Sequence, residues 1–160
     1  MTEERENKKE KNTLTKDPFF KPVILGGLTL ACLSFIFAPA IFIWATLGGY
    51  VAVRLTYKTT KEVISLFDTL LVGLFTGIVG ATFINLVTVI SFNNGEKRRL
   101  LIETLEKNWP SDMASIPNFS DVLPSIFFTA SIFVVLISIA FALLGAYIGL
   151  QLTKKKLKQG

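Results

Sequence analysis

Three long stretches of this chain carry no charged side chain, and they constrain its fold more than any other feature. No Asp, Glu, Lys or Arg occurs within residues 22–53, 69–95 or 122–153. Each stretch exceeds the roughly 18 uncharged apolar residues that mark a candidate membrane helix. Backbone polar groups in hydrocarbon must satisfy their own hydrogen bonds, and none of the stretches alternates as a barrel strand does. We therefore expect an all-α membrane protein.

The first stretch, residues 22–53, is too long for one straight span. As a single helix its 32 residues would measure about 48 Å, against a hydrocarbon core of about 30 Å. Two interpretations fit this length. One is a single tilted helix that is kinked by proline, and the other is a hairpin of two short helices that turns at Phe37–Ala40. The hairpin places Pro39 in the first turn of its second helix, where proline is tolerated.

The distribution of basic residues favours the hairpin, because cytoplasmic flanks of membrane helices collect Lys and Arg. With four spans, thirteen basic residues share the side of both termini and four lie on the other side, whereas three spans give a split of ten to seven. We therefore predict a multi-pass protein of the cell membrane with both termini in the cytoplasm. Its four transmembrane helices are expected at residues 22–37, 39–55, 65–92 and 123–153.

Three segments lie outside these spans. Residues 1–21 are polar and of mixed charge, which predicts a disordered cytoplasmic tail, and residues 154–160 form a basic cytoplasmic tail. The outer loop, residues 93–121, contains a predicted amphipathic helix from Glu96 to Asn108. This helix either lies on the outer leaflet or caps the bundle, or it is an ordinary linker helix. Its apolar positions share one face: Leu101, Ile102 and Leu105.

Two segments that each close an even-numbered span resemble one another. Residues 47–58 and 144–155 are identical at six of twelve aligned positions. One explanation is the duplication of a helical hairpin, which would give two tandem hairpins related by an axis along the membrane normal. The other explanation is chance, because the ends of membrane helices draw on few residue types.

Small residues recur four apart in every predicted span. Residues i and i+4 share a helix face, and small side chains there allow two backbones to approach closely in lipid. The pattern predicts packing faces, either within one chain or between chains. These faces consist of Gly27, Ala31, Ala45, Gly49, Gly73, Gly77, Ala81, Gly145 and Gly149.

The spans offer few groups for chemistry. The chain has no His and a single cysteine, Cys32, and no ionisable residue of the kind that marks a proton path or substrate site lies deep in a span. Asp68 lies at the start of the third span, where the helix dipole favours a carboxylate. Asn85 lies deeper and is the one candidate for a polar path, although helix-to-helix hydrogen bonding is the simpler interpretation. We predict no catalytic residue, no cofactor and no metal site.

Three glycine-rich motifs carry a family resemblance: Leu47–Ala52, Gly73–Ala81 and Leu144–Gly149. With these motifs the chain resembles the small glycine-rich multi-span membrane proteins of unknown function that are found in bacteria and archaea. The resemblance covers the spans but not the outer loop. It implies no site residue, because that family has no assigned catalytic residues.

Together these features predict a structural or accessory integral membrane protein that is not an enzyme. It would associate with itself or with a partner through its small-residue helix faces. The alternative is a small pore or transporter subunit whose homo-oligomers line a path with Asn85. The expected partners are the lipid bilayer and either a second copy of the chain or another membrane protein. Nucleic acid is not expected, because a basic tail beside a membrane helix suits anionic lipids.

Overall fold

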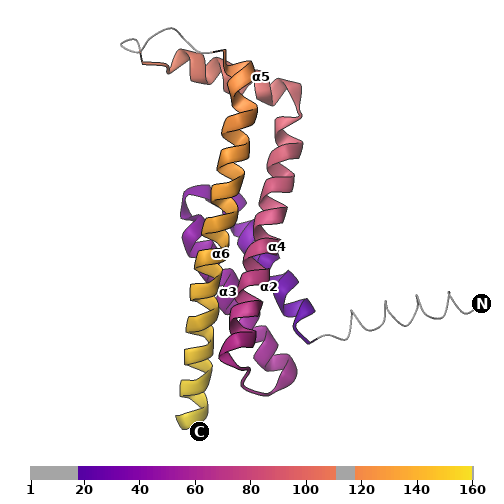
Figure 1. Ribbon diagram of the computed structural model, residues 1–160, viewed down its shortest axis with the longest axis vertical. Helices are drawn as coiled ribbons and strands as arrows, with labels where there is room; N and C mark the ends of the chain where they lie inside the picture. Colours follow the sequence, from indigo (N-terminus) through magenta and orange to yellow (C-terminus); the bar gives the residue numbers. More distant parts are fainter. Residues whose placement is uncertain (1–17, 111–117, 160) are drawn as a thin grey trace, which may run out of the picture.

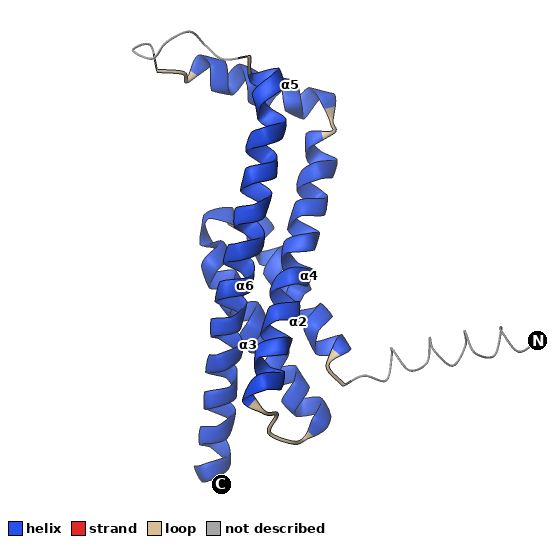
Figure 2. Cartoon of the chain, in the orientation of Figure 1, coloured by secondary structure: helices blue, strands red, loops and turns tan. Residues whose placement is uncertain are grey.

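The computed structural model describes residues 18–110 and 118–159, and nearly all of these residues are helical (Figure 2). They contain five α-helices and one 3-10 turn, with no strand among them. This result confirms the predicted all-α class. The elements are α2 (Phe20–Ile36), η1 (Ala38–Ala40), α3 (Ile41–Thr60), α4 (Leu66–Phe92), α5 (Gly95–Lys107) and α6 (Phe119–Gln159).

Four of these helices are apolar, and three of the four have the length and composition needed to cross a membrane. The three are Ala38–Thr60, which joins η1 to α3, then Leu66–Phe92 and Phe119–Lys155. The fourth, α2, has only 17 residues, slightly fewer than the roughly 20 that a straight span requires. The described residues thus form an apolar four-helix bundle with one short member.

The first apolar stretch forms a hairpin and not one kinked helix. Helix α2 ends at Ile36, Pro39 lies at the start of η1, and α3 then returns beside α2. A Cβ atom built on Gly26 of α2 would lie 2.7 Å from the carbonyl oxygen of Gly48 in α3. The backbones of the two helices are therefore nearly in contact.

The tip of this hairpin is apolar outside and hydrogen-bonded inside. The carbonyl of Phe37 accepts hydrogen bonds from the backbone N–H of Ala40 at 3.2 Å and from Nε1 of Trp44 at 3.0 Å. Residues 35–43 include no polar side chain. This combination suits hydrocarbon better than water, because a backbone in lipid must satisfy its polar groups internally. The exposed apolar side chains are Phe35, Ile36, Phe37, Phe42 and Ile43.

The four apolar helices form a ring in the order α2, α3, α6, α4. Helix α2 packs on α3 and α4, and α6 packs on the same two helices, so that α2 and α6 occupy opposite corners. Helices α3 and α4 also contact each other across the centre. Figure 1 shows α4 and α6 continuing well past the tip of the α2–α3 hairpin toward α5. Two hairpins of unequal length therefore build the bundle.

Helix α2 begins slightly earlier than predicted. Its first residue is Phe20, inside the segment 1–21 that was expected to be a disordered tail. Pro22 lies in the first turn of the helix, where the N–H that proline lacks would have no helical partner in any case. The rest of the predicted tail, residues 1–17, lies outside the described residues.

Helix α6 is longer than predicted at both ends. It begins at Phe119, within the predicted loop 93–121, where the side chain of Asn118 accepts a hydrogen bond from the N–H of Ser120 at 3.2 Å. It then continues to Gln159 through the predicted basic tail 154–160. Lysine is a good helix former and its charge is favourable near a helix C-terminus, so the helix has no physical reason to stop at the apolar boundary.

The link between α3 and α4 ends one helix and begins the next with side-chain and backbone caps. Lys61 adopts a left-handed conformation with φ of 58°, and its N–H donates to the carbonyl of Tyr57 at 2.8 Å. The hydroxyl of Ser65 accepts from the N–H of Asp68 at 3.1 Å and donates to its carboxylate at 2.7 Å. Asp68 therefore has a helix-capping role at the start of α4.

Helix α5 confirms the short helix predicted between the third and fourth spans. The side chain of Asn94 caps it by accepting hydrogen bonds from the N–H groups of Glu96 and Lys97 at 3.1 and 3.3 Å. All three residues of the predicted apolar face are partly buried, and α5 packs on α4 and α6. These three residues are Leu101, Ile102 and Leu105.

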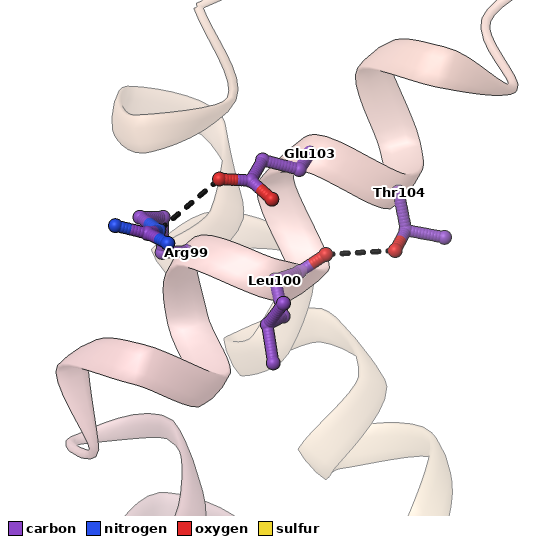
Figure 3. A network of polar contacts seen from close by, with 4 residues as sticks. All are labelled: Arg99, Leu100, Glu103 and Thr104. Atoms are coloured by element: carbon purple, nitrogen blue, oxygen red, sulfur yellow. Dashed lines mark hydrogen bonds and ion pairs between the residues drawn. The ribbon is translucent and has the colours of Figure 1, made fainter.

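The outward face of α5 carries polar contacts that stay within the helix (Figure 3). Arg99 Nε lies 3.1 Å from Glu103 Oε1, and both side chains are well exposed. The hydroxyl of Thr104 donates to the carbonyl of Leu100 at 2.7 Å. An exposed pair of this kind contributes little to stability. The contacts that join α5 to its neighbours are its apolar face and Arg98, which donates to the carbonyl of Ser120 at 3.1 Å and lies 5.2 Å from the centre of the Phe92 ring.

Candidate functional site

The closest approaches between helices are made at glycines, beginning with the doublet of α2. Gly26 and Gly27 are adjacent in sequence and therefore lie about 100° apart around the helix. Gly26 faces α3, where a Cβ would lie 2.7 Å from the carbonyl oxygen of Gly48. Gly27 faces α4, where a Cβ would lie 2.6 Å from Cγ1 of Val79. One doublet thus serves two interfaces at a corner of the ring.

A second doublet gives α3 the same property. Its first member, Gly48, faces α2, and its second member, Gly49, faces α6. A Cβ on Gly49 would collide with the carbonyl oxygen of Ala142, and a Cβ on Gly145 of α6 would collide with the carbonyl oxygen of Thr46. The contact is reciprocal, because each helix presents a glycine to the backbone of the other. It is the tightest helix contact among the described residues.

Helix α4 divides its glycines between two neighbours. Gly73 and Gly77 face α6, and a Cβ on Gly77 would lie 2.6 Å from Cα of Ile139. Gly80 faces α2, where a Cβ would lie 2.9 Å from Cδ1 of Leu30. Every neighbouring pair in the ring is therefore joined at one or more glycines.

All of the small residues that the four-residue spacing selected are buried within the bundle of one chain. The spacing missed three more glycines at the same interfaces: Gly26, Gly48 and Gly80. For Gly26 and Gly48 the missed signal was the Gly-Gly doublet, which places a small residue toward each of two neighbouring helices. The nine selected residues are Gly27, Ala31, Ala45, Gly49, Gly73, Gly77, Ala81, Gly145 and Gly149.

Most hydroxyl groups in the apolar helices bond to the carbonyl four residues earlier in their own helix. Thr76, for example, donates to Val72 at 2.7 Å. Such bonds satisfy the hydroxyl locally and leave nothing to line a polar path. Helix α6 departs from this pattern, since four serine and threonine hydroxyls in its uncharged stretch, residues 122–153, have no hydrogen-bond partner among the described residues. They belong to Ser125, Thr129, Ser131 and Ser138.

Asn85 connects α4 to α6. Its Nδ2 donates to the backbone carbonyl of Ser131 across a long distance of 3.5 Å, and the side chain is partly buried. This contact accounts for the amide as a helix-to-helix hydrogen bond. The side chain that was considered for a polar path is therefore engaged within the chain.

Replacing Asn85 with Leu should have a small effect on stability. Interhelical hydrogen bonds in membrane proteins contribute about 0.6 kcal/mol on average, and the long Asn85 bond should not exceed this value. The fraction of folded protein that survives heating in detergent would measure the change. A matched control is Thr82→Val, because the Thr82 hydroxyl bonds only to its own helix. A loss above about 2 kcal/mol for Asn85→Leu alone would contradict this role.

Beyond the hairpin tip, α4 and α6 pack on each other and on α5, and Phe35 of α2 reaches the groove that Val87 and Phe127 line. We call this part of the pair, residues 87–90 and 122–136, the uncovered α4–α6 surface. On α6 it includes a shallow groove of about 450 Å³ whose lining combines Ser125, Thr129 and Ala130 with two larger apolar residues. The exposed large apolar residues of the surface are Val87, Val89, Ile90, Val122, Ile126, Phe128, Ile132, Phe133 and Leu136.

Comparisons with protein-family models, with curated proteins and with solved structures find no match for this chain. Among the described residues, no group of three or more His, Cys, Asp or Glu side chains could hold a metal ion. The class of the protein therefore comes from the fold alone. It is a small bundle of apolar helices, three of them of membrane-spanning length.

Proposed function

We propose that this chain is a non-enzymatic accessory protein of the cell membrane that associates with a second copy of itself through the uncovered α4–α6 surface. The observation that carries this proposal is the unequal length of the two hairpins. Since α2 and α3 stop part-way along α4 and α6, the longer pair has only α5 as a neighbouring helix over its remaining length (Figure 1). The small-residue faces are occupied within the chain, so association needs a different surface.

The chemistry of the α6 groove supports pairing with another helix. Ser125 and Thr129 lie four residues apart and therefore on one face, and both have exposed side chains without a hydrogen bond among the described residues. Ala130 lies beside them in the same groove. Small and hydroxyl-bearing residues allow close approach and interhelical hydrogen bonds in lipid. The same surface on two copies would meet about a two-fold axis, the commonest symmetry of oligomers.

We place both chain termini in the cytoplasm and α5 outside. Thirteen of the seventeen basic residues then lie on the cytoplasmic side, in agreement with the known bias of membrane proteins. Lys58, Lys154 and Lys155 lie near the C-terminal ends of α3 and α6. The C-terminal end of α6 lies far from α5 in Figure 1. A pore has less support, because Asn85 is bonded within the chain.

Cysteine cross-linking in native membranes tests the proposed association. A single cysteine at Thr129, in a Cys32→Ser background, should form a disulfide-linked dimer on mild oxidation. The matched control is a single cysteine at Ile148, which is also exposed on α6 but lies where α3 and α4 complete the bundle. We expect a dimer for the first variant and a monomer for the second.

The other outcomes of this experiment are equally informative. A cross-linked product heavier than the monomer but different from the dimer would identify a partner protein and would contradict self-association. Monomers at both positions, or equal dimer yields at both, would mean that the uncovered α4–α6 surface faces only lipid.

A further inference from the structure

A second groove lies at the opposite end of the bundle, where α3 and α6 finish side by side. It has a volume of about 350 Å³. Helix α3 supplies Tyr50, Arg54, Tyr57 and Lys58 to its wall, and Gly149 of α6 belongs to the lining as well. The lining thus combines two cations with two phenols, whereas most of the large exposed side chains of the bundle are aliphatic or Phe.

The basic side chains in this groove are arranged on one face of α3. Residues 50, 54 and 58 are separated by four positions, so their side chains follow one another along the helix. Nη1 of Arg54 donates to the hydroxyl of Tyr50 at 3.2 Å, and its guanidinium carbon lies 6.0 Å from the centre of the Tyr50 ring. These contacts hold the guanidinium within the groove while its other N–H groups remain available. Lys58 has an exposed ammonium four residues further on.

The charge at this end of the bundle is not neutralised within the described residues. Their one ion pair joins Arg99 to Glu103 on α5, at the other end of the bundle. The carboxylates nearest to the groove in sequence are those of Glu62 and Asp68. The Asp68 carboxylate accepts a hydrogen bond from the Ser65 hydroxyl, and neither carboxylate forms an ion pair with a basic side chain of the groove. The groove therefore presents net positive charge to a ligand. Neighbouring basic residues that do not line it are Lys61, Lys154 and Lys155.

The depth of the groove favours a lipid over a soluble anion. Arg54 is the first charged residue after the apolar run of residues 22–53, and Lys154 is the first after the run of residues 122–153. Both runs end at the level of the groove, which corresponds to the headgroup region of a bilayer. Tyrosine is enriched at the same level because its ring is apolar and its hydroxyl is polar. Leu152 also lines the groove and is exposed.

We propose that this groove binds the headgroup of an acidic phospholipid. Arg54 and Lys58 would hold the phosphate through charge-assisted hydrogen bonds, with the tyrosine hydroxyls as further donors. An acyl chain would follow the apolar surface of α6 beside Leu152. Basic pockets between membrane helices are known to recognise acidic lipid headgroups. The site is independent of the association surface proposed above, since it lies at the other end of the bundle.

Lipid binding to the purified full-length protein tests the site. Delipidated protein in a neutral detergent would be titrated with phosphatidylglycerol, and the bound lipid measured by native mass spectrometry. Phosphatidylcholine with the same acyl chains and soluble glycerol phosphate serve as the comparison ligands. We expect selective binding of phosphatidylglycerol. In the double variant Arg54→Gln, Lys58→Gln the affinity should fall at least about tenfold, as the loss of hydrogen bonds to charged groups predicts.

A matched double variant separates this groove from diffuse surface charge. The change Lys154→Gln, Lys155→Gln removes the same two charges from the same end of the bundle but leaves the groove lining intact, so lipid affinity should stay within about twofold of the original, as expected for exposed charges. Lys58→Gln alone, at an exposed side chain, gives the same comparison if the first double variant does not fold. Equal losses in the two double variants would overturn the site. Binding of glycerol phosphate or phosphatidylcholine as tight as that of phosphatidylglycerol would also overturn it.

Discussion

Adding one methyl group at Gly145 should destabilise the bundle more than adding one at any glycine outside the helix interfaces. A Cβ at this position would collide with the carbonyl oxygen of Thr46, and the obstructing atoms are backbone atoms that no rotamer change can move. Helices α3 and α6 must then separate, which weakens the packing on both sides of the contact. We expect Gly145→Ala to lower the free energy of unfolding by about 1–3 kcal/mol or more, as for other overpacked interiors.

The fraction of detergent-extracted protein that remains folded on heating would measure this loss. Gly95→Ala is the matched control, because nothing lies within 4 Å of a Cβ at Gly95 and its φ is not positive. Equal losses for the two variants would show that the α3–α6 contact is looser than described.

The reciprocal geometry at this contact also predicts that two such changes will not add. A Cβ at Gly49 would collide with the carbonyl of Ala142, in the same interface as the Gly145 contact. Once the first methyl group has separated the helices, the second meets less resistance. The double variant should therefore lose clearly less stability than the sum of the two single losses, as expected for residues that share an interface. Additive losses would mean that the two collisions are relieved independently.

The fold class could be predicted from the sequence because a membrane leaves few choices. Three uncharged stretches had to be helical, since hydrocarbon offers no partner for backbone polar groups. The hairpin at Pro39 followed from the distribution of basic residues, which a single kinked helix would have divided poorly. The helix ends were predicted less well. Phe20 and Gln159 lie beyond the predicted boundaries because helix formation depends on local caps and propensities, whereas the predictions followed where the charged residues begin.

The candidate site could be predicted only in part. Four-residue spacing describes one face of one helix, so it identified Gly77 and Gly145 but could not say which neighbour each face meets. That choice depends on the order of helices around the ring, which is a property of the tertiary structure. Gly26 and Gly48 were missed for a related reason, because a doublet has meaning only when two neighbours lie about 100° apart around the helix. The partner of Asn85 likewise lies 46 residues away in sequence.

The sequence also could not predict how far each hairpin extends along the axis of the bundle. These extents determine where the first hairpin ends in the bilayer. Leu30 of α2 lies against Gly80 of α4. From this level α2 has six residues, or about 9 Å, to its end at Ile36, whereas α4 continues for twelve residues, or about 18 Å, to Phe92. The hairpin tip therefore stops short of the level at which α4 ends.

A tip at this depth should be protected from water-soluble reagents on both sides of the membrane. Its side chains from 35 to 43 are all apolar, and its one exposed backbone turn is bonded to Ala40 and Trp44. A single cysteine at Ala38, in a Cys32→Ser background, should therefore react with a small membrane-permeant maleimide slowly and with a charged, impermeant maleimide not at all. The experiment uses sealed membrane vesicles of both orientations.

Two further single cysteines define the sides of the membrane in the same experiment. A cysteine at Lys58 lies at the end of α3 and one at Lys107 lies at the end of α5, so the impermeant reagent should reach them from opposite sides. If Ala38 reacts as readily as Lys107 and from the same side, the hairpin reaches the outer surface and crosses the bilayer fully. If Lys58 and Lys107 react from one side, the proposed topology is wrong. Protection of Ala38 alone requires an environment without water around it, and for a turn with five exposed apolar side chains the hydrocarbon of the bilayer provides that environment.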